Sequence, residues 1–188
     1  MQARHIPNLI SGLRIILVVP LVWLIVSYRY EAALLVFAVA GVSDAVDGFL
    51  ARRFDWRSRL GGMLDPVADK LLLIACFVSL GWVGALPLWL VVLVILRDVI
   101  IVSGGLCYHW LIASYDAAPT LPSKLNTFTQ LLLVLVVIVN QGLWMVPQPV
   151  ISLLMLATAA TTVLSGVGYV VIWGRRALAA RSRSDERP

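Results

Sequence analysis

Charged residues are scarce in this sequence, and cysteine is almost absent. Only 13% of the 188 residues are charged, 61% are hydrophobic, and the mean hydropathy is +0.93. Soluble domains are usually about half apolar and about a quarter charged, so this composition excludes an ordinary soluble domain and indicates one integral membrane domain. The two cysteines, Cys76 and Cys107, lie in apolar runs without metal-site spacing and are predicted to be small core side chains.

Targeting and nucleic-acid signals are also missing. The net charge of +5 comes from short basic clusters between apolar runs, which favours an anionic membrane surface or substrate over nucleic acid. The first apolar run lacks a small-residue cleavage site, so we expect a retained helix rather than a signal peptide. Arg4 and Arg14 alone do not form a transit peptide. The expected location is therefore a bacterial inner membrane.

Long apolar runs dominate what is present. About twenty such residues cross a bilayer as a helix, whereas strands would leave lipid-exposed backbone groups unpaired. We therefore predict an all-α integral membrane fold with six transmembrane helices. The domain is expected over residues 1–175, followed by a mobile basic cytoplasmic tail at 176–188. The predicted spans are Leu9–Ser27, Ala32–Phe49, Gly61–Trp82, Leu86–Trp110, Asn126–Val139 with some extension, and Val150–Trp173.

Lysine and arginine are distributed unevenly among the connections between these runs. Every second connection is basic, as is the C-terminal tail, whereas the alternate connections contain only Arg29. Basic connections remain on the cytoplasmic side of a membrane. The pattern therefore predicts that both termini and the basic loops are cytoplasmic, which agrees with an even number of crossings.

Several ionisable residues lie within or beside the apolar runs, where a central Asp, Lys or Arg costs about 2.5–3.5 kcal/mol on insertion scales. Adjacent Arg97 and Asp98 can be explained as a buried ion pair. Four clustered aspartates cannot, because they repel one another unless cations lie between them. The residues concerned are Arg14, Asp44, Asp47, Asp65, Asp69, Lys70, Arg97 and Asp98.

The spacing of the four aspartates predicts a metal site. Asp44 and Asp47 are three residues apart and Asp65 and Asp69 are four apart, so each pair projects from one helix face. The loop between the pairs is short, which makes their helices antiparallel neighbours. Oxygen ligands suit Mg²⁺ or Mn²⁺ better than zinc, and two such ions about 3.5–4 Å apart commonly clamp a phosphoryl group.

Residues suited to phosphate binding adjoin the aspartates. Gly48 would let a substrate approach the helix, Arg52 could bind a phosphate, and Ser58 could add a hydroxyl. An ion or metal transporter is the alternative from another class, since acids within membranes also mark ion paths. Transporter acids are expected near the midplane, often in repeated units, and this sequence shows no repeat.

The residues from Asp44 to Asp69 spell D-x-x-D-G-x-x-A-R-x(8)-G-x(3)-D-x(3)-D. This pattern resembles the complete signature of the CDP-alcohol phosphatidyltransferase family. The stretch IPNLISGLRI is similar to the amphipathic segment that leads into that family's first helix. The resemblance implies the family's six-helix fold, a divalent-metal-dependent transferase and a homodimer.

The same resemblance implies roles for individual residues. The four aspartates would hold two ions, Mg²⁺ or Mn²⁺, that bridge the pyrophosphate of CDP-diacylglycerol, and Asp69 would also accept the proton of the acceptor hydroxyl. The residues that would contact the CDP-lipid are Gly48, Arg52, Ser58 and Asn8.

The remaining cations concern the acceptor. Lys70, Arg97 and Lys124 fall at cytoplasmic helix ends and could converge on an anionic acceptor, although Lys124 could also be an ordinary loop residue. Asn126 could join them or form interhelical hydrogen bonds. VVLVILRDVIIVSGG and LPSKLNTFTQ resemble the cardiolipin-forming branch of the family, which implies phosphatidyl transfer to phosphatidylglycerol. The alternative acceptor is glycerol 3-phosphate, which gives phosphatidylglycerophosphate.

Overall fold

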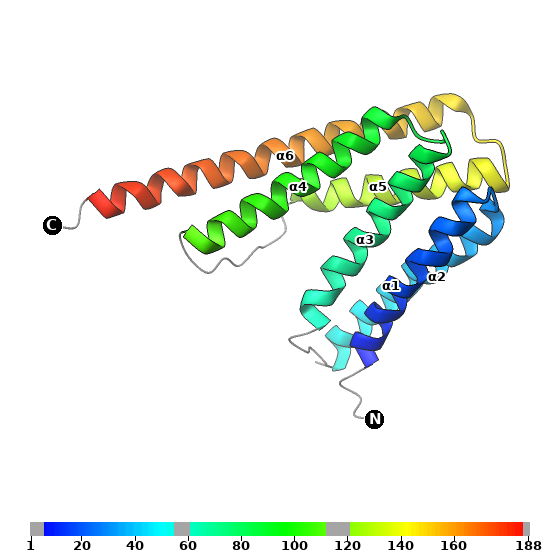
Figure 1. The fold of residues 1–188 in the computed structure, drawn as a ribbon, viewed down its shortest axis with the longest axis horizontal. Helices are drawn as coiled ribbons and strands as arrows, with labels where there is room; N and C mark the ends of the chain where they lie inside the picture. The colour runs from blue at the N-terminus through cyan, green and yellow to red at the C-terminus, as the bar shows by residue number, and fades with distance from the viewer. Residues whose placement is uncertain (1–5, 55–60, 112–120, 186–188) are drawn as a thin grey trace. The chain divides into compact units, whose positions relative to one another are not determined.

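The structure is a computed structural model that describes residues 6–54, 61–111 and 121–185 (Figure 1). Within these ranges every regular element is a helix, which confirms the predicted all-α class. Side chains are described for residues 12–44, 46, 67–104 and 121–171. The helices are α1 (Ile6–Val26), α2 (Tyr30–Phe54), α3 (Gly61–Trp82), α4 (Leu88–Leu111), α5 (Leu121–Gly142) and α6 (Gln148–Asp185).

The largest differences between the helix ends and the predicted bounds occur in α2, α5 and α6. α2 continues to Phe54, so Arg52 belongs to the helix. α5 begins at Leu121, before the predicted Asn126, because Pro122 is tolerated in a first turn, where its missing N–H has no partner to lose. Lys124 therefore lies in the first turn of a helix and not in a loop. α6 continues through Asp185 across the predicted start of the tail, in a segment rich in alanine and arginine, which are strong helix formers.

Two helices in the described part of the chain are long and apolar enough to cross a membrane. They are Leu121–Gly142 and Gln148–Val171, and a shorter apolar helix covers Gly12–Val26. These segments agree with the composition in indicating an integral membrane protein.

The chain divides into two compact units, each of which is described by itself. The first contains Met1–Leu88 and Val134–Ile151, and the second contains Trp89–Leu133 and Ser152–Pro188. In the first unit α1 packs against both α2 and α3. Buried alanines such as Ala33 and Ala68 let these helices approach closely.

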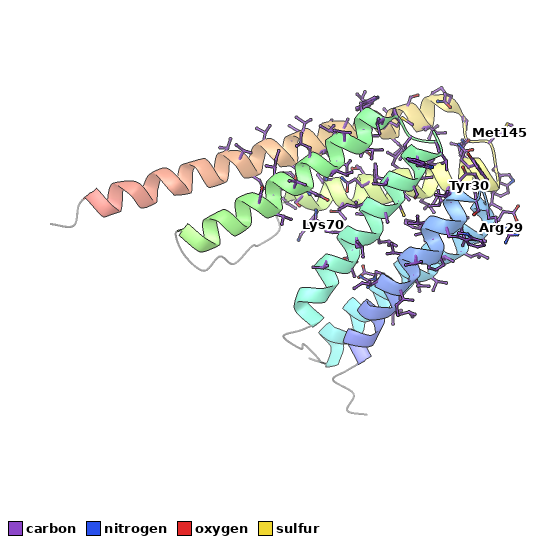
Figure 2. All side chains as sticks on the ribbon, in the orientation of Figure 1. Arg29, Tyr30, Lys70 and Met145 are labelled. Atoms are coloured by element: carbon purple, nitrogen blue, oxygen red, sulfur yellow. The ribbon has the colours of Figure 1, made fainter. Side chains whose placement is uncertain are left out.

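The C-terminal end of α5 packs closely against the start of α2 within the first unit. A Cβ added to Gly142 would come within 2.7 Å of the Tyr30 Cβ and 3.0 Å of the Glu31 backbone nitrogen. Figure 2 marks Tyr30 at this position. Cys76 on α3 is buried and free, as expected for a core side chain. The interior of the first unit is therefore closely packed.

Candidate functional site

Arg14 joins two of the predicted metal ligands. Its side chain is completely buried on α1, and its Nη2 lies 2.8 Å from Oδ1 of Asp44 on α2. Its Nη1 donates a hydrogen bond to Oδ1 of Asp69 on α3. One guanidinium group therefore brings together one aspartate from each half of the motif, and α1 supplies the cation between them.

The two aspartates differ from Arg14 in exposure. The Asp44 side chain is 51% exposed and that of Asp69 is 43% exposed, whereas the Arg14 side chain is 0% exposed. Arg14 thus forms the buried side of a site whose carboxylates are open on the other side. A buried cation is costly unless it is paired, so these contacts account for Arg14 in an otherwise apolar helix.

The other predicted ligands lie on the same helices. α2 is continuous from Tyr30 to Phe54 and α3 from Gly61 to Trp82, so Asp47 follows Asp44 by one turn and Asp65 precedes Asp69 by one turn. The side chains of these two further aspartates are outside the described residues. The side chains of Arg52 on α2 and Asn8 on α1 are also outside the described residues, as are the surroundings of Gly48. Ser58 falls between the described ranges.

The described residues fit a hard divalent cation. Asp44 and Asp69 offer carboxylate oxygens from two helices that both pack against α1, and carboxylates are the ligands that Mg²⁺ and Mn²⁺ prefer. Among the side chains that the structure describes, no group of three or more candidate ligands occurs. That set includes two of the four predicted aspartates.

Arg97 forms a second buried ionic contact, in the second unit. Its Nη1 lies 2.7 Å from Oδ1 of the adjacent Asp98 on α4. Its Nη2 donates hydrogen bonds to the hydroxyls of Ser123 on α5, at 2.9 Å, and Ser165 on α6, at 2.5 Å. Arg97 therefore ties three helices together, and the ion pair considered for Arg97 and Asp98 is observed.

Asn126 is completely buried between α5 and α6. Its Oδ1 accepts hydrogen bonds from the hydroxyls of Thr161, at 3.2 Å, and Thr162, at 2.8 Å. The Thr129 and Thr161 hydroxyls lie 2.9 Å apart. These are interhelical hydrogen bonds, which hold helices together where lipid supplies no hydrophobic drive. The second unit thus contains a buried polar cluster beside its apolar core.

The two lysines predicted for the acceptor lie in different units. Lys70, which Figure 2 labels, follows Asp69 on α3. Its side chain is half-buried. Lys124 is exposed on α5, where with Ser123, Thr127 and Phe128 it lines a shallow pocket of about 360 Å³. The convergence of these cations on one acceptor stays a prediction.

The contact made by Arg14 was missed by the sequence analysis, which counted this residue among the unexplained charges. A signal was present. A lone arginine in an apolar first helix requires a counter-ion, and the motif aspartates are among the few acids within the predicted spans. Neither the choice of Asp44 and Asp69 nor the serine partners of Arg97 had a comparable signal.

Comparison with known proteins agrees with this motif. The family model of CDP-alcohol phosphatidyltransferases matches residues 4–171. A human cardiolipin synthase (CMP-forming) is 34% identical over 184 residues, which cover 87% of this chain and 60% of the human protein. A cardiolipin synthase (CMP-forming) of Streptomyces coelicolor is 42% identical over 99 residues, covering 50% of this chain and 46% of that protein.

A third relative has a different printed function. The CDP-diacylglycerol–glycerol-3-phosphate 3-phosphatidyltransferase of Blochmanniella floridana is 34% identical over 124 residues, covering 63% of this chain and 64% of that protein. The chain spans 60% of the length of the human relative. Because the family model covers most of the chain, including all four aspartates of the motif, the chain belongs to the CDP-alcohol phosphatidyltransferase family.

Proposed function

We propose that this protein transfers the phosphatidyl group of CDP-diacylglycerol to a hydroxyl of phosphatidylglycerol, forming cardiolipin and releasing CMP. The proposal rests on one observation: the guanidinium group of Arg14 contacts both Asp44 and Asp69, in a chain that matches this family. Relatives named cardiolipin synthase, aligned over most of the chain, support the choice of acceptor.

The donor side of the site is proposed to contain two divalent ions, Mg²⁺ or Mn²⁺, held by Asp44, Asp47, Asp65 and Asp69. When bound, such ions neutralise charge on the pyrophosphate and on the departing CMP. The residues proposed to contact the CDP-lipid are Gly48, Arg52, Ser58 and Asn8. Arg52 would supply a planar pair of donors to a phosphate.

Asp69 is proposed to accept the proton of the acceptor hydroxyl. The hydroxyl oxygen attacks the phosphorus of the phosphatidyl group, the bond from that phosphorus to the bridging oxygen breaks, and CMP leaves. A base must come within hydrogen-bond reach of the proton that it removes. Asp69 suits this role because its side chain is 43% exposed while Arg14 holds one of its oxygens.

The acceptor is proposed to depend on Lys70, Arg97, Lys124 and Asn126. Lys124 is the exposed member of this group and suits direct contact with a phosphate. Arg97 donates to Ser123, the residue before Lys124, and Asn126 bonds α5 to α6. Both buried residues would therefore act by holding the first turn of α5 in position.

Glycerol 3-phosphate is the second candidate acceptor. It is supported by the relative named as a glycerol-3-phosphate 3-phosphatidyltransferase. Both acceptors carry a phosphate, which suits a basic acceptor region, and the donor chemistry is the same for each.

All six helices are proposed to cross a bacterial inner membrane, with both termini and the site on the cytoplasmic side. The apolar segments of α1, α5 and α6 support crossing helices, and the asymmetric distribution of lysine and arginine supports the orientation. Residues 1–175 would form the catalytic domain and residues 176–188 its basic tail. A homodimer is proposed from the resemblance to the family.

The test is an assay in detergent micelles with CDP-diacylglycerol and Mg²⁺, in which phosphatidylglycerol and glycerol 3-phosphate are offered in separate tubes. Lipid product and released CMP are both measured, and EDTA serves as the control. Cardiolipin in the first tube alone is the expected result. Phosphatidylglycerophosphate in the second tube alone would favour the second candidate. Absence of CMP release from both tubes, together with metal transport by the same protein in sealed lipid vesicles, would contradict the enzyme.

A further inference from the structure

The Arg14 guanidinium group lies between Asp44 and Asp69, on the buried side of the proposed metal site. Its side chain is 0% exposed, and its two terminal nitrogens contact carboxylates from two different helices. Asp44 and Asp69 would repel each other at such close range if no cation lay between them. Arg14 therefore links α1 to both α2 and α3 at the motif before any divalent ion is bound.

The buried position of Arg14 also means that its charge stays when metal arrives. A side chain with no exposed surface has no route into solvent, in contrast to a surface arginine such as Arg29, which lies over the Trp23 ring at 5.8 Å. A divalent ion bound by Asp44 and Asp69 would lie a few ångströms from the guanidinium group. At that range like charges repel strongly in a partly buried site.

We infer that Arg14 is the resident counter-cation of this site: it holds Asp44 and Asp69 together in the metal-free protein and lowers the affinity of the site for divalent ions. This inference rests on the proposed metal site. A planar guanidinium suits the task because it can contact two carboxylates at once. The structure shows one nitrogen on each carboxylate.

The Arg14 cation changes the net charge of the metal-loaded site. Four aspartates contribute −4, two divalent ions +4 and Arg14 +1, so the loaded site carries a net charge of +1. Without Arg14 the loaded site would be neutral. The residual positive charge favours the pyrophosphate of the donor, which is anionic. Arg14 would thus lower the affinity of the site for metal and strengthen its attraction for the anionic substrate.

A merely structural role for Arg14 makes the opposite prediction about metal. If Arg14 only ordered the carboxylates, its loss would disorder the ligands and weaken metal binding. If it is a counter-cation, its loss destabilises the metal-free protein but tightens metal binding. The sign of the change in metal affinity separates the two roles.

The experiment uses the full chain in detergent, stripped with EDTA and titrated with Mn²⁺ while free Mn²⁺ is followed by electron paramagnetic resonance. Arg14→Gln removes the charge, Arg14→Lys keeps it, and Arg29→Gln makes the same charge change at an exposed arginine of the same unit. Arg14→Gln is expected to bind Mn²⁺ about tenfold more tightly than wild type. The other two variants are expected to stay within about twofold of wild type, because the charge beside the carboxylates is kept. The thermal transition of the metal-free protein should fall clearly further for Arg14→Gln than for Arg29→Gln.

Each outcome decides the matter. Equal or weaker Mn²⁺ binding by Arg14→Gln would overturn the inference. If that variant does not fold, Arg14→Lys decides, since weaker binding there would indicate that geometry rather than charge is what Arg14 supplies. If wild type itself binds no Mn²⁺, the proposed metal site fails, a result distinct from failure of the counter-cation role.

Discussion

The buried pair of Arg97 and Asp98 allows a quantitative prediction about stability. Arg97→Leu removes a cation that contacts Asp98 at 2.7 Å inside the second unit, where both residues are buried. Breaking a buried pair by removing one partner typically costs about 3–5 kcal/mol, because the remaining charge loses its compensation. The lost hydrogen bonds to Ser123 and Ser165 each add about 0.6 kcal/mol, the average for interhelical bonds in membranes.

The double variant Arg97→Leu/Asp98→Leu should behave differently. Replacing both members of a buried ion pair with apolar residues of similar volume is often neutral or stabilising. The double variant is therefore expected to be markedly more stable than Arg97→Leu alone. Asp98→Leu alone should also be destabilised, since it leaves Arg97 without its carboxylate.

The assay is unfolding by SDS in mixed micelles, followed by the loss of helical circular dichroism. Arg29→Leu is the matched control. It removes an exposed arginine that lies 5.8 Å from the Trp23 ring centroid, and such a contact is worth about 0.5–1 kcal/mol. A double variant as unstable as Arg97→Leu would refute the reasoning, because the cost would then come from something other than an uncompensated charge.

Three further predictions concern the donor site and the packing. Asp65→Asn is expected to abolish CMP release, because an amide is a poor substitute for a ligand carboxylate; ordinary turnover in the micelle assay would exclude Asp65 as a ligand. Arg52→Ala should raise the apparent KM for CDP-diacylglycerol about tenfold, the loss of one charge-assisted hydrogen bond, and an unchanged KM would remove Arg52 from the donor site. Gly142→Ala should cost about 1–3 kcal/mol in SDS unfolding, because its Cβ would meet Tyr30 and the Glu31 backbone, whereas Gly168→Ala, with nothing within 4 Å, should cost nothing.

Local pattern was sufficient for the elements of this fold. The helices follow from apolar runs separated by short polar connections, and α3 has the predicted bounds, Gly61–Trp82. The one-turn separation of Asp44 from Asp47, and of Asp65 from Asp69, follows from residue spacing once those segments are helical. α5 begins at Leu121, earlier than the predicted Asn126, and its first turn tolerates Pro122.

The sequence by itself thus determined the helical class, the family and the register of the aspartates, because each of these depends on residues close together in the chain. Only the tertiary structure decided which charges meet. Arg14 and Asp69 are 55 residues apart, and Arg97 and Ser165 are 68 apart. Their contacts depend on how each helix is rotated against its neighbours. In the first unit that rotation is set by the packing of α1 against α2 and α3, whose buried residues include Ala33 and Ala68. No local pattern encodes that rotation, so the cation between the two halves of the motif became visible only in the folded chain.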